Sequence, residues 1–372
     1  MEPDLAIVHC PVGGGHKAAA LALAEAASAR GLRVVVLDAF EHSPRVLGRA
    51  YLAAHLTVQG ALPALYDSAY FGSNHRDGAL EPIRRGVDHL AWAGLVRRVV
   101  ALSPRGVVAT HHLPLVVLGR ARRMGRLAAP LVGVVTDYGT HAVWAEKGVD
   151  ALCVPRDSAR REAEDHGFRA DRVHVTGIPV RAAFAAVPEA PDPLRGELLR
   201  VLVTSGGFGV GPVGAIVQSF AGVPRVELTV VCGRAEGLVA RVRAIAARTG
   251  VKARVLGYER DMPSRVAEAH LVVGKAGGLT TTEAMTAGRP MIIAGATAGN
   301  EAINAELVVS GGAGVMARPR EVGVIADRLR AVRALAAMGA SARRLVVDRA
   351  ADRVLDVALR AAGGALARAR AA

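Results

Sequence analysis

The stretch of residues 270–288 constrains the fold more than any other part of the chain. An apolar, β-branched run at 270–273 predicts a short buried strand, and residues 284–288 predict the end of a short helix at a glycine. Between them, residues 274–283 supply a Gly-Gly turn and three successive threonines. A strand, a glycine turn and a helix in this order are typical of a parallel α/β sheet.

The turn at 274–283 is a candidate phosphate site. A helix N-terminus offers unpaired backbone N–H groups and the positive end of a dipole, and glycines let a ligand approach the backbone. Glu283 lies one turn into the helix, where its carboxylate could accept hydrogen bonds from a ribose diol. The alternative is a tight structural turn in which Glu283 is only a favourable N-terminal charge, and the local pattern does not choose between the two.

Strand and helix patterns alternate on both sides of a proline-rich segment at 187–193. The pattern predicts an α/β fold of two Rossmann-like domains, residues 1–187 and 197–350, that face each other across an interdomain cleft. Residues 188–196 are the predicted linker. The final segment, 351–372, is predicted to be a helix that can pack back on the N-terminal domain.

Polar residues follow successive predicted strands in the first half, where side chains of a parallel sheet can converge. These residues are His16, His111, His112, Asp137 and His141. His16 comes after a glycine loop that has neither P-loop nor dinucleotide-binding spacing. A histidine there suits a general base near neutral pH, with Asp137 as the second candidate, although His16 could instead cap the helix or orient a ligand. The histidine spacing argues against a catalytic metal.

The alternation is interrupted between residues 43 and 102, an insertion that we expect to bind a second substrate. Its second helical pattern, 80–102, sets apolar residues including Trp92 against arginines including Arg84 and Arg85. A basic amphipathic helix of this kind can lie in a membrane interface. It can equally cover a domain core with its arginines in water, which is the more frequent arrangement.

The chain has 372 residues and a formal net charge of +14, which suits an anionic membrane, a nucleic acid or a polyanionic substrate, or simply a solvated basic face. No transmembrane or signal-peptide pattern is visible. Cys10, Cys153 and Cys232 fall in predicted strands, so we expect small core residues in a reducing compartment. A cytoplasmic location follows as an expectation.

Taken together, the motifs resemble those of the GT-B glycosyltransferases that include monogalactosyldiacylglycerol synthase and the processive diacylglycerol glucosyltransferases, and more distantly MurG. In family order, the motifs that carry this resemblance lie at 13–16, 136–144, 177–179, 205–207, 257–262, 275–284 and 299–304. The block at 136–144 followed by Gly177-Ile178-Pro179 favours the glycolipid synthases over MurG.

The resemblance implies an inverting transferase that uses a UDP-sugar, a lipid acceptor such as diacylglycerol, no metal and no cofactor. His16 matches the family's functional histidine, and the first domain would bind the acceptor, with Gly15, His141, Arg84, Arg85 and Trp92 on the acceptor or membrane side. The implied nucleotide-sugar residues are Gly206, Gly207, Lys275, Gly277, Gly278, Thr280, Glu283, Asn300 and Glu301. The net charge and the helix at 80–102 fit docking on an anionic membrane, so we expect a peripheral position at the inner face of the cell membrane and no nucleic-acid partner.

Two departures from the family pattern leave the donor sugar open. Asn300 stands where the family usually has glutamine, and the segment 295–298 lacks the usual prolines. Three alternatives to lipid glycosylation stay open at this point: a UDP-sugar 2-epimerase, a non-catalytic nucleotide-sugar-binding protein, and a transferase for a soluble or undecaprenyl-type acceptor.

Overall fold

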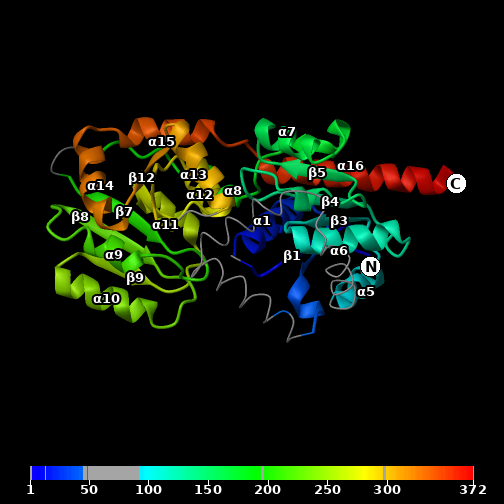
Figure 1. The fold of residues 1–372 in the computed structure, drawn as a ribbon, viewed down its shortest axis with the longest axis horizontal. Coiled ribbons are helices and arrows are strands. Elements are labelled where there is room, and N and C mark those ends of the chain that lie inside the picture. Colours follow the sequence, from blue (N-terminus) through cyan, green and yellow to red (C-terminus); the bar gives the residue numbers. More distant parts are fainter. Residues whose placement is uncertain are drawn as a thin grey trace. The chain divides into compact units, whose positions relative to one another are not determined.

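The computed structural model describes residues 2–12, 14–44, 48, 92–193, 197–295 and 299–371. The chain divides into two compact units (Figure 1). The first comprises residues 1–181 together with 347–372, and the second comprises residues 182–346. Each is built on one parallel sheet flanked by helices, so the α/β alternation predicted from the sequence is confirmed.

The first unit carries a six-stranded parallel sheet in the order β2-β1-β3-β4-β5-β6. Its strands are β1 (Leu5–His9), β2 (Val34–Asp38), β3 (Gly106–Ala109), β4 (Leu131–Val134), β5 (Ala151–Val154) and β6 (Val173–Val175). Strands β1, β3, β4 and β5 are buried along their whole length. Burial on both faces explains why they appear in the sequence as continuous apolar runs.

Helices cover both faces of this sheet. They are α1 (Gly15–Ala29), α5 (Ala93–Leu102), α6 (His112–Arg123), α7 (Asp157–Asp165) and α16 (Ala350–Ala371), with short 3-10 turns η1 (Ala39–His42), η2 (Ala142–Trp144) and η3 (Ala170–Arg172). Leu5 and Ile7 of β1 belong to the core formed with α1 and α16, whereas Val8 belongs to the core formed with α5, α6 and α7. Alternation of side chains along a strand produces these two layers.

The second unit carries another six-stranded parallel sheet, in the order β12-β11-β10-β7-β8-β9. Its strands are β7 (Leu199–Thr204), β8 (Val226–Val231), β9 (Ala253–Leu256), β10 (Leu271–Gly274), β11 (Met291–Ala294) and β12 (Gly314–Ala317). Its helices are α8 (Ala182–Ala185), α9 (Val213–Gln218), α10 (Leu238–Thr249), α11 (Met262–Glu268), α12 (Gly278–Thr286), α13 (Asn300–Ser310), α14 (Val322–Ala331) and α15 (Leu335–Arg344), with the 3-10 turn η4 (Pro319–Glu321).

The division between the units differs from the predicted one at both crossings. We predicted that the first domain extends to Val187, but the unit ends at Arg181. The reason is α8, because its Phe184 is buried and the helix contacts α11 and α12 of the second unit. At the other crossing, the second unit ends at Val346 and not at residue 350, and α16 packs against α1, β3, β4 and β5 of the first unit (Figure 1).

Both sheets reverse their strand order once, and these reversals locate the sites. In the first unit the reversal lies between β1 and β3, and in the second it lies between β7 and β10. The loops that leave the carboxyl ends of two such strands diverge to opposite faces, so they leave a crevice in which open α/β sheets bind ligands. The three cysteines are buried and free, as predicted, but only Cys153 lies in a strand, while Cys10 and Cys232 directly follow β1 and β8.

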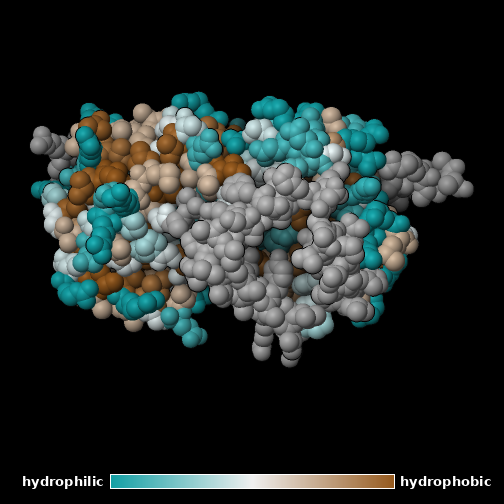
Figure 2. Space-filling model, viewed as in Figure 1, coloured by the Kyte–Doolittle hydropathy of each residue, from teal (hydrophilic) through white to brown (hydrophobic). Residues whose placement is uncertain are grey.

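Hydrophobic and hydrophilic residues are interspersed on the visible face of the molecule (Figure 2). The largest exposed apolar side chains among the described residues lie on different elements; they include Leu21, Met124, Met316, Val324 and Val332. Scattered apolar residues of this kind are normal for a protein surface. They do not by themselves mark a membrane-binding face.

Candidate functional site

His16 lies at the strand-order reversal of the first unit, in the first turn of α1. Its Nδ1 is 2.8 Å from the carbonyl oxygen of Thr110, the residue that comes directly after β3. The Thr110 hydroxyl in turn donates to the carbonyl of His16 over 2.9 Å. Nδ1 is also 2.9 Å from the hydroxyl oxygen of Thr136, which lies just after β4. Residues that follow the neighbouring strands β3 and β4 therefore hold this imidazole, which itself lies after β1.

A chain of aromatic contacts continues from His16. The ring of His16 packs edge-on against that of His111, with 4.4 Å between the ring centroids. The rings of His111 and His112 are stacked, with 4.1 Å between their centroids. His112 faces the indole of Trp144 at 6.3 Å. His111 also caps α6, because its Nδ1 accepts a hydrogen bond from the Leu113 N–H. The structure therefore brings together His16, His111 and His112, as their positions after successive strands predicted.

The loop after β4 is fixed on α7. The backbone N–H of Thr140 donates to the Glu162 carboxylate over 2.5 Å, and the Thr140 hydroxyl donates to the carbonyl of Ala159. His141 is buried and its Nδ1 accepts from the Val143 N–H, so it caps η2. His141 thus has a local structural role, while its predicted contact with an acceptor remains a prediction.

The electrostatics of His16 suit a base. Burial lowers the pKa of His16 below its ordinary value, and the carboxylate of Asp137 and the Thr110 carbonyl oppose part of this shift. The imidazole is therefore neutral at pH 7 and carries a lone pair, while a nearby negative charge is available to stabilise the imidazolium. His16 and Asp137, the two predicted catalytic residues, act on each other electrostatically.

The membrane prediction for Trp92 is wrong. Its indole is only 4% exposed and lies 5.3 Å from the ring of Phe40, within the hydrophobic core of the first unit. In α5, the next helix, Leu95 and Val99 are buried while Arg97 is exposed. Over residues 93–102 the amphipathic pattern therefore covers a core. Arg84 and Arg85 lie outside the described residues.

In the second unit, Lys275 lies at the strand-order reversal, directly after β10. Its Nζ is 2.7 Å from Oε1 of Glu301, which lies in the first turn of α13. The aliphatic part of Lys275 runs past Gly211 of the β7–α9 loop and Gly295 after β11. Two predicted nucleotide-sugar residues are therefore ion-paired, and three loops gather at the lysine.

Asn304 of α13 links this helix to the turn after β10. Its side chain is fully buried and its amide donates to the carbonyl of Ala276 over 2.8 Å. The start of α13, with Asn300 and Glu301, is thereby tied to the turn that opens α12. Asn304 was not among the predicted site residues, although the sequence motif 299–304 contains it.

The predicted glycines have different roles. A side chain on Gly277, which caps α12, would meet open space, so this turn presents its backbone to a ligand. Gly206 has φ +69°, and its N–H donates to the Thr204 hydroxyl. Gly207 accepts from the Arg234 N–H through its carbonyl. The Gly206 and Gly207 loop is therefore held by β7 and by the loop after β8.

The remaining predicted residues of this site lie on α12 and at the start of α1. Gly278 is buried in the first turn of α12, while Thr280 and Glu283 on the same helix are partly exposed. Gly15 begins α1 in the first unit. The positions agree with the elements that the sequence predicted, and the ligand contacts of these residues remain predictions.

An aromatic residue of the motif 257–262 was not among the predicted site residues. Tyr258, after β9, is 50% exposed, and the guanidinium of Arg234 lies 3.9 Å from its ring centroid. An exposed ring with a cation on one face is a platform on which a planar base can stack. The signal was present, since both residues come after predicted strands, but only the contact between them identifies the pair.

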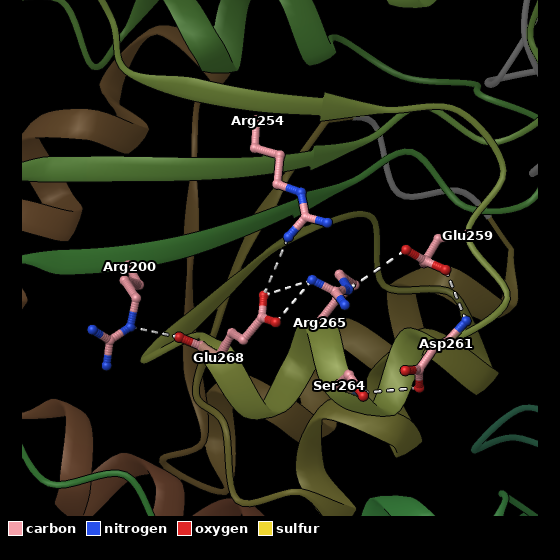
Figure 3. A network of polar contacts seen from close by, with 7 residues as sticks. All are labelled: Arg200, Arg254, Glu259, Asp261, Ser264, Arg265 and Glu268. Atoms are coloured by element: carbon pink, nitrogen blue, oxygen red, sulfur yellow. Dashed lines mark hydrogen bonds and ion pairs between the residues drawn. The ribbon is translucent and has the colours of Figure 1, made fainter.

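A polar network holds the loop that carries Tyr258 (Figure 3). Arg265 of α11 pairs with Glu268 at 2.8 Å and with Glu259 at 3.5 Å. Glu259 also accepts from the Asp261 N–H, and Asp261 caps α11 at Ser264. The same view shows Arg254 and Arg200 reaching Glu268 from β9 and β7, through its carboxylate and its carbonyl respectively. The network fixes the loop relative to the sheet.

The described part of the chain lacks two kinds of feature. Within it, no group of three or more histidine, cysteine, aspartate or glutamate residues is placed to hold a metal ion. None of the helices described there combines the length and the hydrophobicity that a membrane span requires.

Comparison with known proteins shows what each unit is similar to. Residues 16–180 match the family model described as monogalactosyldiacylglycerol (MGDG) synthase, and residues 216–337 match the glycosyltransferase family 28 C-terminal domain. The crystal structure of Acinetobacter baumannii MurG superposes with a TM-score of 0.63 at 18% identity, over 96% of this chain and 100% of that one. The chain has the GT-B fold of the glycosyltransferases that it resembles. The predicted fold class and family resemblance are confirmed.

Two proteins with named activities are similar to this chain over most of its length. The probable MGDG synthase 2, chloroplastic, of Oryza sativa subsp. japonica is 28% identical over 348 residues, which cover 86% of this chain and 71% of the relative. The processive diacylglycerol beta-glucosyltransferase of Bacillus thuringiensis (strain Al Hakam) is 25% identical over 328 residues, 85% and 82% of the two chains. Both family models favour transfer over the epimerase alternative.

Proposed function

We propose that this glycosyltransferase moves a hexose from a UDP-sugar to a lipid acceptor such as diacylglycerol, with inversion and without a metal. The observation that carries the proposal is the imidazole of His16, held by Thr110 and Thr136 at the strand-order reversal of a unit whose residues 16–180 match the MGDG synthase family model. The named relatives act on diacylglycerol or are MGDG synthases, which supports a lipid acceptor.

The second unit would hold the donor. The first turn of α12 and the ammonium of Lys275 face the diphosphate, and Glu283 takes the ribose. Asn300 and Glu301 take hydroxyls of the sugar. The Lys275–Glu301 pair supports this arrangement, because a cation already held at 2.7 Å from one carboxylate is positioned for a second anion. The exposed face of Tyr258 would carry the uracil ring.

The first unit would carry out the proton transfer. The acceptor hydroxyl loses its proton to His16, and its oxygen attacks the anomeric carbon from the face opposite UDP. The carbon–oxygen bond to the diphosphate breaks, and UDP leaves as an anion stabilised by Lys275 and the helix N-terminus in place of a metal. Asp137 would stabilise the imidazolium that forms, and it is the second candidate for the base.

A lipid acceptor requires the protein to reach a membrane surface. The net charge of +14 supports peripheral binding to an anionic bilayer, and the exposed Arg97 and Arg98 on α5 contribute to it. We propose a location at the inner face of the cell membrane. Loss of vesicle binding at high salt is the expected behaviour, because surface charge interactions are screened.

The test is UDP release by the purified protein. UDP-glucose, UDP-galactose and UDP-N-acetylglucosamine are each supplied with anionic vesicles that contain or lack diacylglycerol. Release that requires diacylglycerol supports the proposal and names the donor, and product anomer analysis by NMR tests inversion. Full activity in the presence of a chelator is expected. Tight UDP binding without lipid-dependent release would contradict the lipid acceptor and direct the search to soluble or undecaprenyl-type acceptors.

A further inference from the structure

The contacts of His16 decide which of its two nitrogens is free. Nδ1 lies 2.8 Å from the carbonyl oxygen of Thr110, and a carbonyl oxygen can only accept a hydrogen bond. Nδ1 therefore carries the proton in the neutral ring, and the lone pair is on Nε2. The opposite tautomer would place two lone pairs against each other at this distance.

The Thr136 hydroxyl oxygen is a second partner of the same N–H, at 2.9 Å. Thr136 is only 2% exposed and lies just after β4, so its place is set by the sheet and not by solvent. The N–H of an imidazolium is a stronger donor than that of a neutral imidazole. Its two acceptors therefore stabilise the charged ring more than the neutral one.

We propose that Thr136 is a positioning residue for the transfer reaction: together with the Thr110 carbonyl it holds His16 with Nδ1 protonated and Nε2 free to take the acceptor's proton. The proposal rests on the proposed role of His16 as the base. The proton moves from the acceptor hydroxyl to Nε2, while the proton on Nδ1 stays between the two threonine oxygens. Thr136 itself exchanges no proton and touches no substrate.

Other ionisable groups near His16 do not replace this role. Asp137 acts on the ring through its charge and favours the imidazolium. The rings of His111 and His9 lie on neighbouring elements, and His9 also interacts with Asp38 and Lys17. These groups bias the charge of the site. The Thr110 carbonyl selects the tautomer, and the Thr136 oxygen is the second acceptor for the same N–H.

The experiment compares Thr136→Val with Thr136→Ser in the full chain. Valine keeps the branched shape but removes the acceptor, while serine keeps the hydroxyl. Long-range 1H–15N NMR of histidine-labelled protein, with His16 assigned through His16→Gln, reports the tautomer and the pKa. Thr176→Val is a matched control, because Thr176 is also a buried threonine after a strand, and its hydroxyl donates to the carbonyl of Gly177 instead of accepting from a histidine.

We expect wild-type His16 to be protonated at Nδ1 when neutral. Thr136→Val should lower the His16 pKa by about half a unit to one unit and turnover by about tenfold, as for loss of a hydrogen bond to a charged group. Thr136→Ser should stay within about twofold of wild type in turnover. Thr176→Val should leave the His16 pKa and turnover unchanged.

Two results would overturn the proposal: a wild-type His16 protonated at Nε2, or a folded Thr136→Val protein whose His16 pKa equals that of wild type. A loss of turnover that serine does not restore would also count against it, since that pattern indicates a packing defect. Normal turnover of His16→Ala would instead remove the proposed function. The NMR titration would still report the effect of Thr136 on His16, so the two failures are distinguishable.

Discussion

The strand-order reversals of the two units share a topology and differ in the residues at the carboxyl ends of their strands. In the first unit, β1, β3 and β4 lead into imidazoles and buried hydroxyls that hydrogen-bond across the reversal. In the second unit, β7 and β10 lead into glycines and a lysine that pairs with a glutamate on α13. The arrangement in the first unit fixes the imidazole of His16. The arrangement in the second unit leaves the backbone at Gly277 accessible near the ammonium of Lys275.

The difference matches the two kinds of chemistry that we propose for the units. The proposed proton transfer needs one nitrogen in one tautomer, and His16 has partners from the two loops after β3 and β4. Binding a diphosphate needs many weak donors and little side-chain bulk, so the second unit uses open glycines such as Gly277 at the start of α12. The residue types after the strands, and not the strands themselves, separate the roles.

The largest expected effect is that of His16→Ala on turnover. Loss of a general base should lower kcat by a factor of about 10² to 10⁴, while the Kd for UDP stays that of wild type, because His16 belongs to the other unit. The pH profile of the wild type should lose activity on the acid side with a midpoint below 6.5, since burial lowers the pKa of His16.

The control for that experiment is His166→Ala, because His166 ends α7 outside the site. Stopped-flow turnover and calorimetric UDP titration provide the two readouts. If His16→Ala weakened UDP binding as strongly as turnover, the separation of roles between the two units would be wrong.

The next effect concerns His270, whose Nδ1 accepts a hydrogen bond, whereas the Nδ1 of His16 donates one. His270 lies just before β10, and its Nδ1 accepts from the Arg200 N–H over 3.1 Å. Burial, with the nearby arginines, lowers the pKa of His270 to about 4 from an ordinary value of 6.5. Between these two pKa values the unfolded chain binds more protons at His270 than the folded chain does. The contribution of His270 to the free energy of unfolding is therefore fully present above pH 6.5 and is lost as the pH falls toward 4.

The loss should reach about 2.5 kcal/mol of unfolding free energy at pH 4.5. Urea unfolding of wild type and His270→Gln at pH 7.5 and pH 4.5 measures it, because glutamine keeps an acceptor but does not titrate. Equal pH dependence in the two proteins would show that His270 does not supply this term.

The sequence predicted most of the fold because each buried strand has an unambiguous pattern. The runs at 5–9, 131–134 and 271–274 are short, apolar and followed by turn residues, and all three form central strands. The unit boundary was harder, because only tertiary contacts place α8 and its Phe184 with the second unit. The proline-rich segment at 187–193 indicates that a linker is near, but it does not show which residues before it pack on the second unit.

At the site, the sequence predicted residues but not their partners. It placed Lys275 and Glu301 among the nucleotide-sugar residues without indicating that they pair. Trp92 fitted a membrane-facing pattern, and its burial against Phe40 depends on a residue far earlier in the chain. Periodicity defines one face of a helix, whereas distant residues decide how that face is covered.

A smaller effect is expected for the ion pair of the second unit. Lys275→Ala should weaken UDP binding by about tenfold to a hundredfold, the loss typical of a charge-assisted hydrogen bond. Glu301→Gln should do the opposite for UDP, because it removes the carboxylate that competes for the ammonium, but it should lower turnover with the complete donor.

Lys252→Ala is the matched control, since Lys252 is an exposed lysine paired with Glu227 away from the reversal. Calorimetric titration with UDP and with the UDP-sugar distinguishes the two contributions. Weaker UDP binding in Glu301→Gln would mean that the glutamate orients Lys275 more than it competes with the ligand.

The smallest expected effect tests whether the second unit contacts the uracil base of UDP. Tyr258→Leu should weaken UDP binding by about fivefold, because stacking of a base on an aromatic ring contributes on the order of 1 kcal/mol. Tyr258→Phe should bind UDP as the wild type does, since the ring remains beneath Arg234. Both variants should bind inorganic diphosphate like the wild type. An equal loss for UDP and diphosphate would show that Tyr258 acts through the Glu259–Arg265 network of its loop and not through the base.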